Sequence, residues 1–315
     1  MHVLLTGAFG NLGLNTLHHL LQQGHSVTCL DLDNPRNRKI ADTIDGNIRI
    51  VWGDITQAAV VREAVRGADA IIHHAAMLPP ATDLFPEKAW RVNVEATQQL
   101  INTLKATKPD AVFVYPSSLT VFGYTQDREP PRRVIEDTHP TDEYTRAKVA
   151  CEEALINSRL NYVILRVGVA IGLDHSKAGL AVLRSQFAVA PDNRLEFVHP
   201  DDVALACANA LTRPAAWQRI LLLGGGQDCQ IRQRDMINGV FGAAGFYFDD
   251  SAFGDEPFYT DWLDTRESQH ILEFQRHSFT DFATEAAHQL RWLRRLLWPL
   301  RPLLNWAAKK LLSPK

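Results

Sequence analysis

The sequence predicts an α/β fold with a doubly wound parallel sheet and a small carboxyl-terminal lobe. Short apolar runs alternate with helical patterns through the first half of the chain, as in proteins that cover a parallel sheet with helices on both faces. A glycine-rich loop joins the first predicted strand to the first predicted helix. The 315 residues are 46% hydrophobic and 22% charged, which provides enough apolar material for one large packed domain.

Each predicted strand is short and rich in Val, Ile and Leu, which is typical of strands buried on both faces. The predicted strands are His2–Leu5, Ser26–Asp31, Ile48–Trp52, Ala70–His73, Ala111–Pro116, Tyr162–Val167 and Ile220–Leu223. Between them, apolar residues recur at helical spacing. The predicted helices are Leu12–Gln23, Ala58–Arg66, Ala89–Thr107 and Glu143–Arg159.

The regular alternation of predicted strands and helices ends after Gly172, and this change predicts a second structural unit. We expect residues 1–172, with residues 196–226 added to the same sheet, to form a dinucleotide-binding domain. Residues 173–195 and 227–289 mix helices with acidic, aromatic loops and are expected to form the substrate lobe. Residues 290–315 form a basic tail.

Composition excludes several functional classes. The net charge of −3 gives no overall attraction to nucleic acid. The four cysteines have no CxxC or metal-type spacing, so we expect reduced thiols and no metal site. The apolar start of the chain is too short for a signal peptide, which favours a cytoplasmic protein. The cysteines are Cys29, Cys151, Cys207 and Cys229.

The glycine loop from Gly7 to Gly13 is the strongest single motif. It reads GxxGxxG and lies directly between the first strand and the first helix. Glycine lets the main chain approach a pyrophosphate closely, and the helix amino terminus offers unpaired N–H groups to it. The loop therefore predicts a dinucleotide site.

Two acids follow the next strands. Asp31 at the end of the second strand can accept both ribose hydroxyls of adenosine and repels a 2′-phosphate, which favours NAD over NADP. Arg36 and Arg38 weaken that preference, and a loop acid or helix cap is the alternative for Asp31. Asp54 is interpreted either as an acceptor for the adenine amino group or as a helix N-cap.

Tyr144 and Lys148 lie four residues apart on a predicted helix, so both face one side. A nearby ammonium, with the positive nicotinamide ring, stabilises a phenolate and makes Tyr144 a usable base. Ser117 and Ser118 follow a predicted strand, at the edge where ligands bind in open α/β sheets. A hydroxyl there can hold the substrate oxygen; a capping serine is the alternative.

Together these motifs resemble the extended short-chain dehydrogenase/reductase family, and the nucleotide-sugar epimerase and dehydratase group in particular. The resemblance runs from residue 1 to about residue 275 and implies a Rossmann-type domain. Its motifs are TGAFGNLG, GDIT, HHAA, RVNVEAT, PSSLTVFG, YTRAK, LRVGVAIG and FVHPDDVA.

The resemblance implies roles for individual residues. Tyr144 is the expected acid/base, Lys148 its partner, and Ser118 the hydroxyl that orients the substrate. Asn93 is expected to organise the backbone and water of the site. The expected cofactor contacts are Gly7, Phe9, Gly10, Asn11, Leu12, Gly13, Asp31, Asp54, Ile55, Ala75, Ala76, Asn93, Tyr144 and Lys148. Family members often dimerise through two helices, here Ala89–Thr107 and Glu143–Arg159, so a homodimer is expected.

Three departures from the family pattern narrow the substrate. Leu119 and Thr120 replace the Asp-Glu pair of the dehydratases, so water elimination lacks its acid and base. Val169 replaces an asparagine that bonds a diphosphate in nucleotide-sugar enzymes. The segment between Gly172 and Val198 is shorter than in those enzymes, which suggests a smaller or more apolar substrate.

The tail, residues 290–315, is rich in Lys, Arg and Trp and contains no acid. Its leucines recur at helical spacing, which favours either an interfacial membrane helix or a terminal helix packed on its own domain or on a second subunit. Pro299 and Pro302 interrupt the pattern. With the membrane interpretation, the substrate is a lipid or an isoprenoid alcohol.

The sequence thus predicts an NAD-dependent oxidoreductase that exchanges hydride with a secondary alcohol or ketone carbon of a small or lipid-like substrate. Two alternatives stay open: an epimerase or isomerase that recycles its NAD, and a non-catalytic NAD-binding regulatory protein. The set of Ser118, Tyr144 and Lys148 argues against the latter, since a sensor does not need a tuned phenol.

Overall fold

The computed structural model describes residues 1–172, 180–291 and 308–313. Its centre is a seven-stranded sheet in the order β3-β2-β1-β4-β5-β6-β8, with every neighbouring pair parallel. The predicted fold class, a doubly wound parallel sheet, is confirmed. The strands of this sheet are β1 (His2–Thr6), β2 (Ser26–Asp31), β3 (Ile48–Trp52), β4 (Ala70–His73), β5 (Val112–Ser118), β6 (Asn161–Val167) and β8 (Arg219–Leu223).

Helices cover both faces of the sheet because consecutive strand residues point to opposite sides. Val3 and Leu5 of β1 belong to the core under one helical layer, whereas Leu4 between them belongs to the other core. The first layer contains α1 (Asn11–Gln22), α9 (Pro200–Ala210) and α11 (Arg266–Leu272), and the second contains α3 (Ala58–Val65), α6 (Ala96–Thr107) and α7 (Glu143–Ile156). Two short helices, α2 (Pro35–Ala41) and α4 (Ala81–Leu84), lie in connections between strands.

The predicted helix Ala89–Thr107 is helical throughout, but it contains an irregular turn that was not predicted. The chain forms α5 (Pro86–Trp90), a π-helical turn over Arg91–Glu95, and then α6. Within that turn the carbonyl oxygen of Asn93 accepts from the Thr97 hydroxyl at 2.5 Å and from the Cys151 thiol at 3.1 Å. These side-chain partners come partly from α7, so the helical period alone does not reveal the turn.

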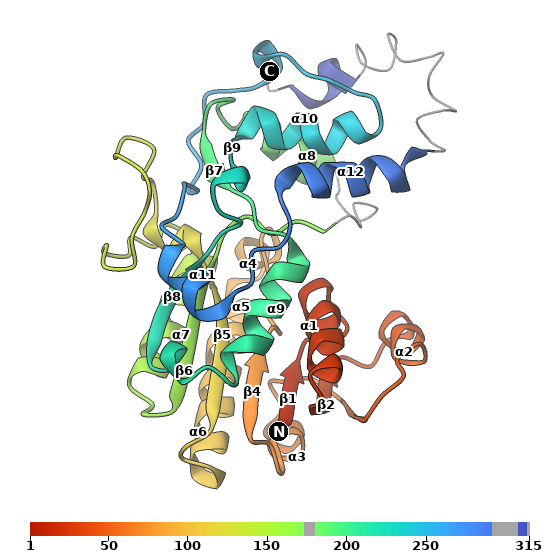
Figure 1. The fold of residues 1–315 in the computed structure, drawn as a ribbon, viewed down its shortest axis with the longest axis vertical. Coiled ribbons are helices and arrows are strands. Elements are labelled where there is room, and N and C mark those ends of the chain that lie inside the picture. The colour runs from red at the N-terminus through yellow and green to blue at the C-terminus, as the bar shows by residue number, and fades with distance from the viewer. Residues whose placement is uncertain (173–179, 292–307, 314–315) are drawn as a thin grey trace.

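The smaller lobe lies above the carboxyl ends of the sheet strands (Figure 1). It contains an antiparallel pair, β7 (Arg194–Glu196) with β9 (Gln230–Arg232), and the helices α8 (Leu180–Ala188), α10 (Gln233–Ala243) and α12 (Phe279–Gln289). Phe187 is fully buried there and packs edge-on against Phe248 at 4.8 Å between ring centroids. Ligands of open α/β sheets bind beyond the strand carboxyl ends, which is where this lobe stands.

Most of the basic tail lies outside the described residues, including Pro299 and Pro302. Residues 308–313 of the tail are described and pack on the lobe. Leu312 is buried in the cluster of Phe187 and Phe248, and the Lys309 ammonium pairs with Asp249 at 3.0 Å. These contacts favour self-packing for this short part of the tail.

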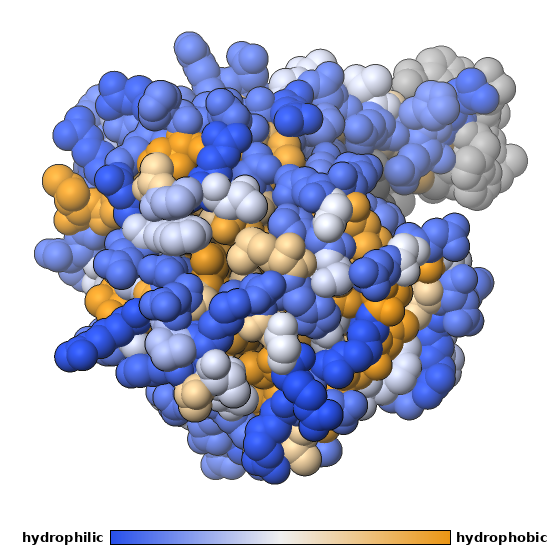
Figure 2. Space-filling view, turned by 60° about the horizontal axis from the view of Figure 1, so that its bottom comes forward, coloured by the Kyte–Doolittle hydropathy of each residue, from blue (hydrophilic) through white to orange (hydrophobic). Residues whose placement is uncertain are grey.

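None of the described helices is long and apolar enough to cross a membrane. The face shown in Figure 2 is largely hydrophilic, and its apolar atoms form separate patches instead of one continuous belt.

Candidate active site

The glycine loop is shaped by close backbone contacts. Gly7 has φ +62°, and a Cβ on it would lie 2.9 Å from the backbone nitrogen of Ala75. A Cβ on Gly13 would lie 2.0 Å from the carbonyl oxygen of Gly7. Only glycine therefore lets α1 begin so close to the end of β1.

Helix α1 begins at Asn11 with Gly10 as its N-cap, and no side chain caps it. Its first turn carries no acid. The N–H groups of this turn therefore face the space beyond β1 without a competing anion, which suits a pyrophosphate. Phe9 contributes only backbone here, because its ring is buried 5.4 Å from the Trp52 ring.

Asp31 braces the glycine loop. One of its oxygens accepts from the Phe9 N–H at 2.8 Å, and the other accepts from the Leu32 N–H at 2.8 Å and the Asn37 amide at 3.1 Å. The carboxylate remains half-exposed. Arg38, the nearby cation considered for a 2′-phosphate, is paired with Asp33 at 2.6 Å.

The segment after β3 gives a mixed result for Asp54. Its side chain accepts from the N–H and the hydroxyl of Thr56, at 2.9 and 2.8 Å, and so closes a turn. The predicted N-cap role is wrong, because α3 begins at Ala58 with Gln57 as its N-cap. Ile55 is buried in the core under α3.

Asn93 holds the chain after β4 in place. Its amide oxygen accepts from the Met77 N–H at 2.7 Å, and its amide nitrogen donates to the Met77 carbonyl at 3.0 Å. This pair of hydrogen bonds fixes the backbone that follows Ala75 and Ala76, which are both half-buried, with Ala75 against Gly7 of the glycine loop.

A buried histidine network, which the sequence analysis missed, supports the same segment. The single hydrogen of the Thr97 hydroxyl is donated to the Asn93 carbonyl. Thr97 must therefore accept from the His73 Nε2–H, at 2.9 Å. The Thr6 hydroxyl then donates to His73 Nδ1 at 2.6 Å. Burial lowers the pKa of His73 to about 3, and that of His74 equally, so both rings are neutral at pH 7. The sequence signal for this network is the motif HHAA, but only the packing of β1, β4 and α6 reveals its hydrogen bonds.

Ser118, Tyr144 and Lys148 come together at the carboxyl end of β5. Burial raises the pKa of Tyr144 to about 12, a hydrogen bond with Ser118 acts to lower it, and Asp142 adds to the rise. Ser118 also accepts from the Thr120 N–H at 3.2 Å and caps the short 3₁₀ turn Leu119–Phe122. Ser118 therefore caps this turn and also bonds Tyr144.

The Lys148 ammonium lies between two phenol rings. It is 4.6 Å from the ring centroid of Tyr115 and 5.6 Å from that of Tyr144, and it donates to the Pro116 carbonyl at 2.7 Å. Burial lowers the pKa of Lys148 to about 8. A cation held this close to Tyr144 stabilises its phenolate form.

Ser117 bonds a different partner from Ser118. Its hydroxyl donates to a Glu152 carboxylate oxygen at 2.5 Å, and Glu152 forms a buried ion pair with Arg166 at 2.8 Å. Neither Glu152 nor its bond to Ser117 was found from the sequence, because the two residues lie 35 positions apart.

The turn from His199 to Asp202 connects two segments that are far apart in the sequence. Asp202 is fully buried and accepts from the backbone N–H groups of Arg276 and His277 and from the His277 ring at 2.6 Å. It ties α9 to the chain that enters α12.

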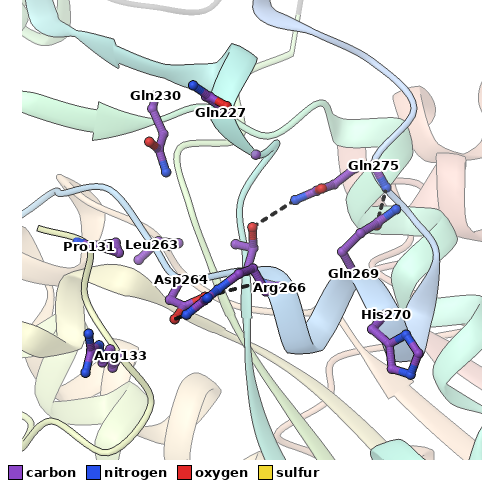
Figure 3. A pocket seen from close by; sticks show the side chains of 12 residues that line it. Pro131, Arg133, Gln227, Gln230, Leu263, Asp264, Arg266, Gln269, His270 and Gln275 are labelled. Atoms are coloured by element: carbon purple, nitrogen blue, oxygen red, sulfur yellow. Dashed lines mark hydrogen bonds and ion pairs between the residues drawn. The ribbon is translucent and has the colours of Figure 1, made fainter.

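A cavity of about 700 Å³ lies at the sheet edge beyond β8 (Figure 3). None of the predicted catalytic or cofactor residues lines it. Leu263 in its lining belongs to one apolar cluster with Leu119 and Phe122 of the turn that Ser118 caps. The lining residues are Pro131, Arg133, Gly226, Gln227, Gln230, Leu263, Asp264, Thr265, Arg266, Gln269, His270 and Gln275.

Comparison with known sequences finds relatives at about 30% identity. A protein of Sinorhizobium fredii, itself uncharacterised, is 31% identical over 224 residues, which are 66% of this chain and 52% of that protein. A 3-beta-hydroxysteroid dehydrogenase of Mycolicibacterium neoaurum is 30% identical over 162 residues, 49% of this chain and 42% of that enzyme. The chain therefore spans about half the length of the curated relatives it matches.

A solved structure shares the fold over nearly the whole chain. It is a short-chain dehydrogenase/reductase superfamily protein from Agrobacterium tumefaciens with bound NAD, 19% identical, with a TM-score of 0.77 over 95% of this chain and 99% of that one. A family model, described as the NAD dependent epimerase/dehydratase family, matches residues 3–224. The protein therefore belongs to the NAD-dependent epimerase/dehydratase family.

Proposed function

We propose that this protein is an NAD-dependent oxidoreductase that exchanges hydride with a secondary alcohol or ketone carbon. The observation that carries the proposal is the grouping of Ser118, Tyr144 and Lys148 at the carboxyl end of β5. The uncapped start of α1 and the half-exposed carboxylate of Asp31 lie along the same edge of the sheet. The proposed catalytic residues and the proposed dinucleotide site thus lie at the same edge of the sheet.

The residues present fit a dinucleotide, and their roles follow from their positions. The α1 amino terminus would hold the pyrophosphate and Asp31 the adenosine ribose, which favours NAD over NADP. Bound NAD supplies the hydride acceptor or donor. Ser118 would hold the substrate oxygen, Tyr144 would take or return its proton, and Lys148 would stabilise the phenolate.

A small or lipid-like substrate is supported by the side chains around the approach to Tyr144. Helices α4 and α5 both contact α7, which carries Tyr144. Leu84 and Phe85 in this region are exposed, as are Leu78 before them and Trp90 after them. Exposed large apolar residues on neighbouring helices favour an apolar ligand. Val169, where an asparagine would bond a diphosphate, fits the same proposal.

The first test is the nucleotide content of the freshly purified protein, released by denaturation and identified by mass spectrometry. A site that is empty but binds added NADH reversibly supports the oxidoreductase, and a panel of secondary alcohols and ketones then identifies substrates. Near-stoichiometric retained NAD would favour instead the epimerase or isomerase that recycles its cofactor.

The catalytic assignment is tested by Tyr144→Phe. We expect this variant to bind NADH as the wild type does and to lose nearly all turnover, because the ring stays in place and the proton carrier is removed. Retained turnover would refute the assigned mechanism. The homodimer and the membrane contact expected from the sequence stay predictions.

A further inference from the structure

Three buried side chains link the end of β5 to its neighbours. Glu152 on α7 accepts from the Ser117 hydroxyl on β5 at 2.5 Å and pairs with Arg166 on β6 through two bonds, of 2.8 and 3.2 Å. Each of the three residues is at most 4% exposed. Ser117 and Arg166 are also register partners in the sheet. The carboxylate therefore joins two strands and a helix at one point.

This point lies next to the Lys148 ammonium. Glu152 follows Lys148 by four residues, so both side chains leave the same face of α7. Ser117 immediately follows Pro116, whose carbonyl accepts from Lys148, and immediately precedes Ser118. Glu152 thus acts on the site in two ways, through the backbone that presents Ser118 and through its charge near Lys148.

The charges in this buried region do not cancel. Arg166 and Lys148 are cations and Glu152 is the anion between them, while the two histidines nearby are neutral. Among the described residues, the Arg166 Nη1 atom is buried without a hydrogen-bond partner. Burying an ion pair costs desolvation free energy, so stability alone gives little reason for it. Ionisation of Tyr144 would supply the missing negative charge.

We infer that Glu152 is a positioning residue of the active site, which holds Ser118 and the Lys148 ammonium in place through Ser117, Arg166 and its own charge. This inference rests on the proposed function. Several groups face Lys148 from the elements packed around it. They are Tyr144, Cys151 and Glu152 on α7, Tyr115 on β5, His73 and His74 at the end of β4, and Arg166 on β6 through Glu152.

The test measures the titration of Lys148 directly in the full chain without substrate. Lysine labelled with ¹³C at the ε carbon is followed by NMR from pH 6 to 10, and Lys148→Arg identifies the signal. In Glu152→Gln we expect the pKa of Lys148 to fall by about one unit from its value of about 8. At pH 7.5 the charged fraction would then fall about threefold.

Three further variants sharpen the result. Glu153→Gln removes the same charge from the exposed neighbour and should leave Lys148 unchanged. Glu152→Asp keeps the charge and should restore most of the wild-type titration. Arg166→Gln removes the cation that pairs with Glu152 and should raise the pKa of Lys148. The expected shift is opposite to that in Glu152→Gln, so this variant tests the inference if Glu152→Gln does not fold.

Titration of Lys148 in Glu152→Gln that matches Glu153→Gln would overturn the inference. The same holds if Arg166→Gln lowers the pKa of Lys148. Ser117→Ala separates the two routes: it should leave the titration unchanged and still reduce kcat on any substrate found in the panel. The NMR readout needs no turnover, so failure of the proposed reaction would be recognised separately. In that case the substrate panel yields no substrate, while the pKa of Lys148 still shifts in Glu152→Gln as expected.

Discussion

Replacing Gly13 by alanine should break the dinucleotide site while leaving the fold recognisable. The new Cβ would lie 2.0 Å from the Gly7 carbonyl oxygen and 2.9 Å from Ala8 Cα. Reaching even 3.0 Å requires the loop to move by about 1 Å. Gly7 is itself held in the left-handed region against Ala75, so α1 must retreat instead. Overpacking of this kind costs about 1–3 kcal/mol.

Two assays measure the consequence. Urea unfolding should show a loss of about 2 kcal/mol in the free energy of unfolding, and fluorescence titration should show at least about tenfold weaker NADH binding, equivalent to about 1.4 kcal/mol. Gly24→Ala is the matched control, since Gly24 has φ +76° and no atom within 4 Å of its Cβ position. Its strain should cost about 1 kcal/mol without changing NADH affinity. Wild-type affinity in Gly13→Ala would refute the reasoning.

Three other changes test different parts of the structure. Burial raises the pKa of Glu196 from 4.5 to about 7. The folded protein therefore keeps a proton that the unfolded chain has lost, and the stability that this proton gives is lost as the pH rises through 7. As the pH rises from 5 to 8, wild type should therefore lose about 2 kcal/mol of unfolding free energy relative to Glu196→Gln. A stability difference between the two proteins that does not change with pH would contradict this. Asn93→Ala removes both bonds to Met77 and should cost about 2 kcal/mol in urea unfolding and weaken NADH binding; unchanged affinity would show that the clamp does not serve the cofactor. Asp31→Ser should reduce the NADH-to-NADPH affinity ratio by about tenfold or more, measured by titration with both nucleotides, and an unchanged ratio would remove Asp31 from the selection of the cofactor.

Elements that depend on neighbours along the chain were predictable from the sequence. Strands β2, β3 and β4 were predicted at their observed bounds because a buried parallel strand needs an uninterrupted apolar run. The contiguous glycine loop and the four-residue spacing of Tyr144 and Lys148 are equally local signals. Their positions at the strand ends follow from the rules of parallel sheets.

Features that depend on contacts between distant segments were not predictable. The π-helical turn at Asn93 is explained by partners on α6 and α7, which the sequence does not place beside it. The histidine network joins β1, β4 and α6, so its neutral rings could not be inferred from two adjacent histidines.

The sequence by itself determined the fold class, the family resemblance and the residues that face one edge of the sheet. Only the tertiary structure decided which of two adjacent serines bonds Tyr144, because Ser117 is bonded to Glu152, 35 residues away. It also decided that Lys148 is buried and carries a lowered pKa. Hydrophobic period and glycine spacing act along the chain, whereas desolvation and ion pairing depend on which segments pack together.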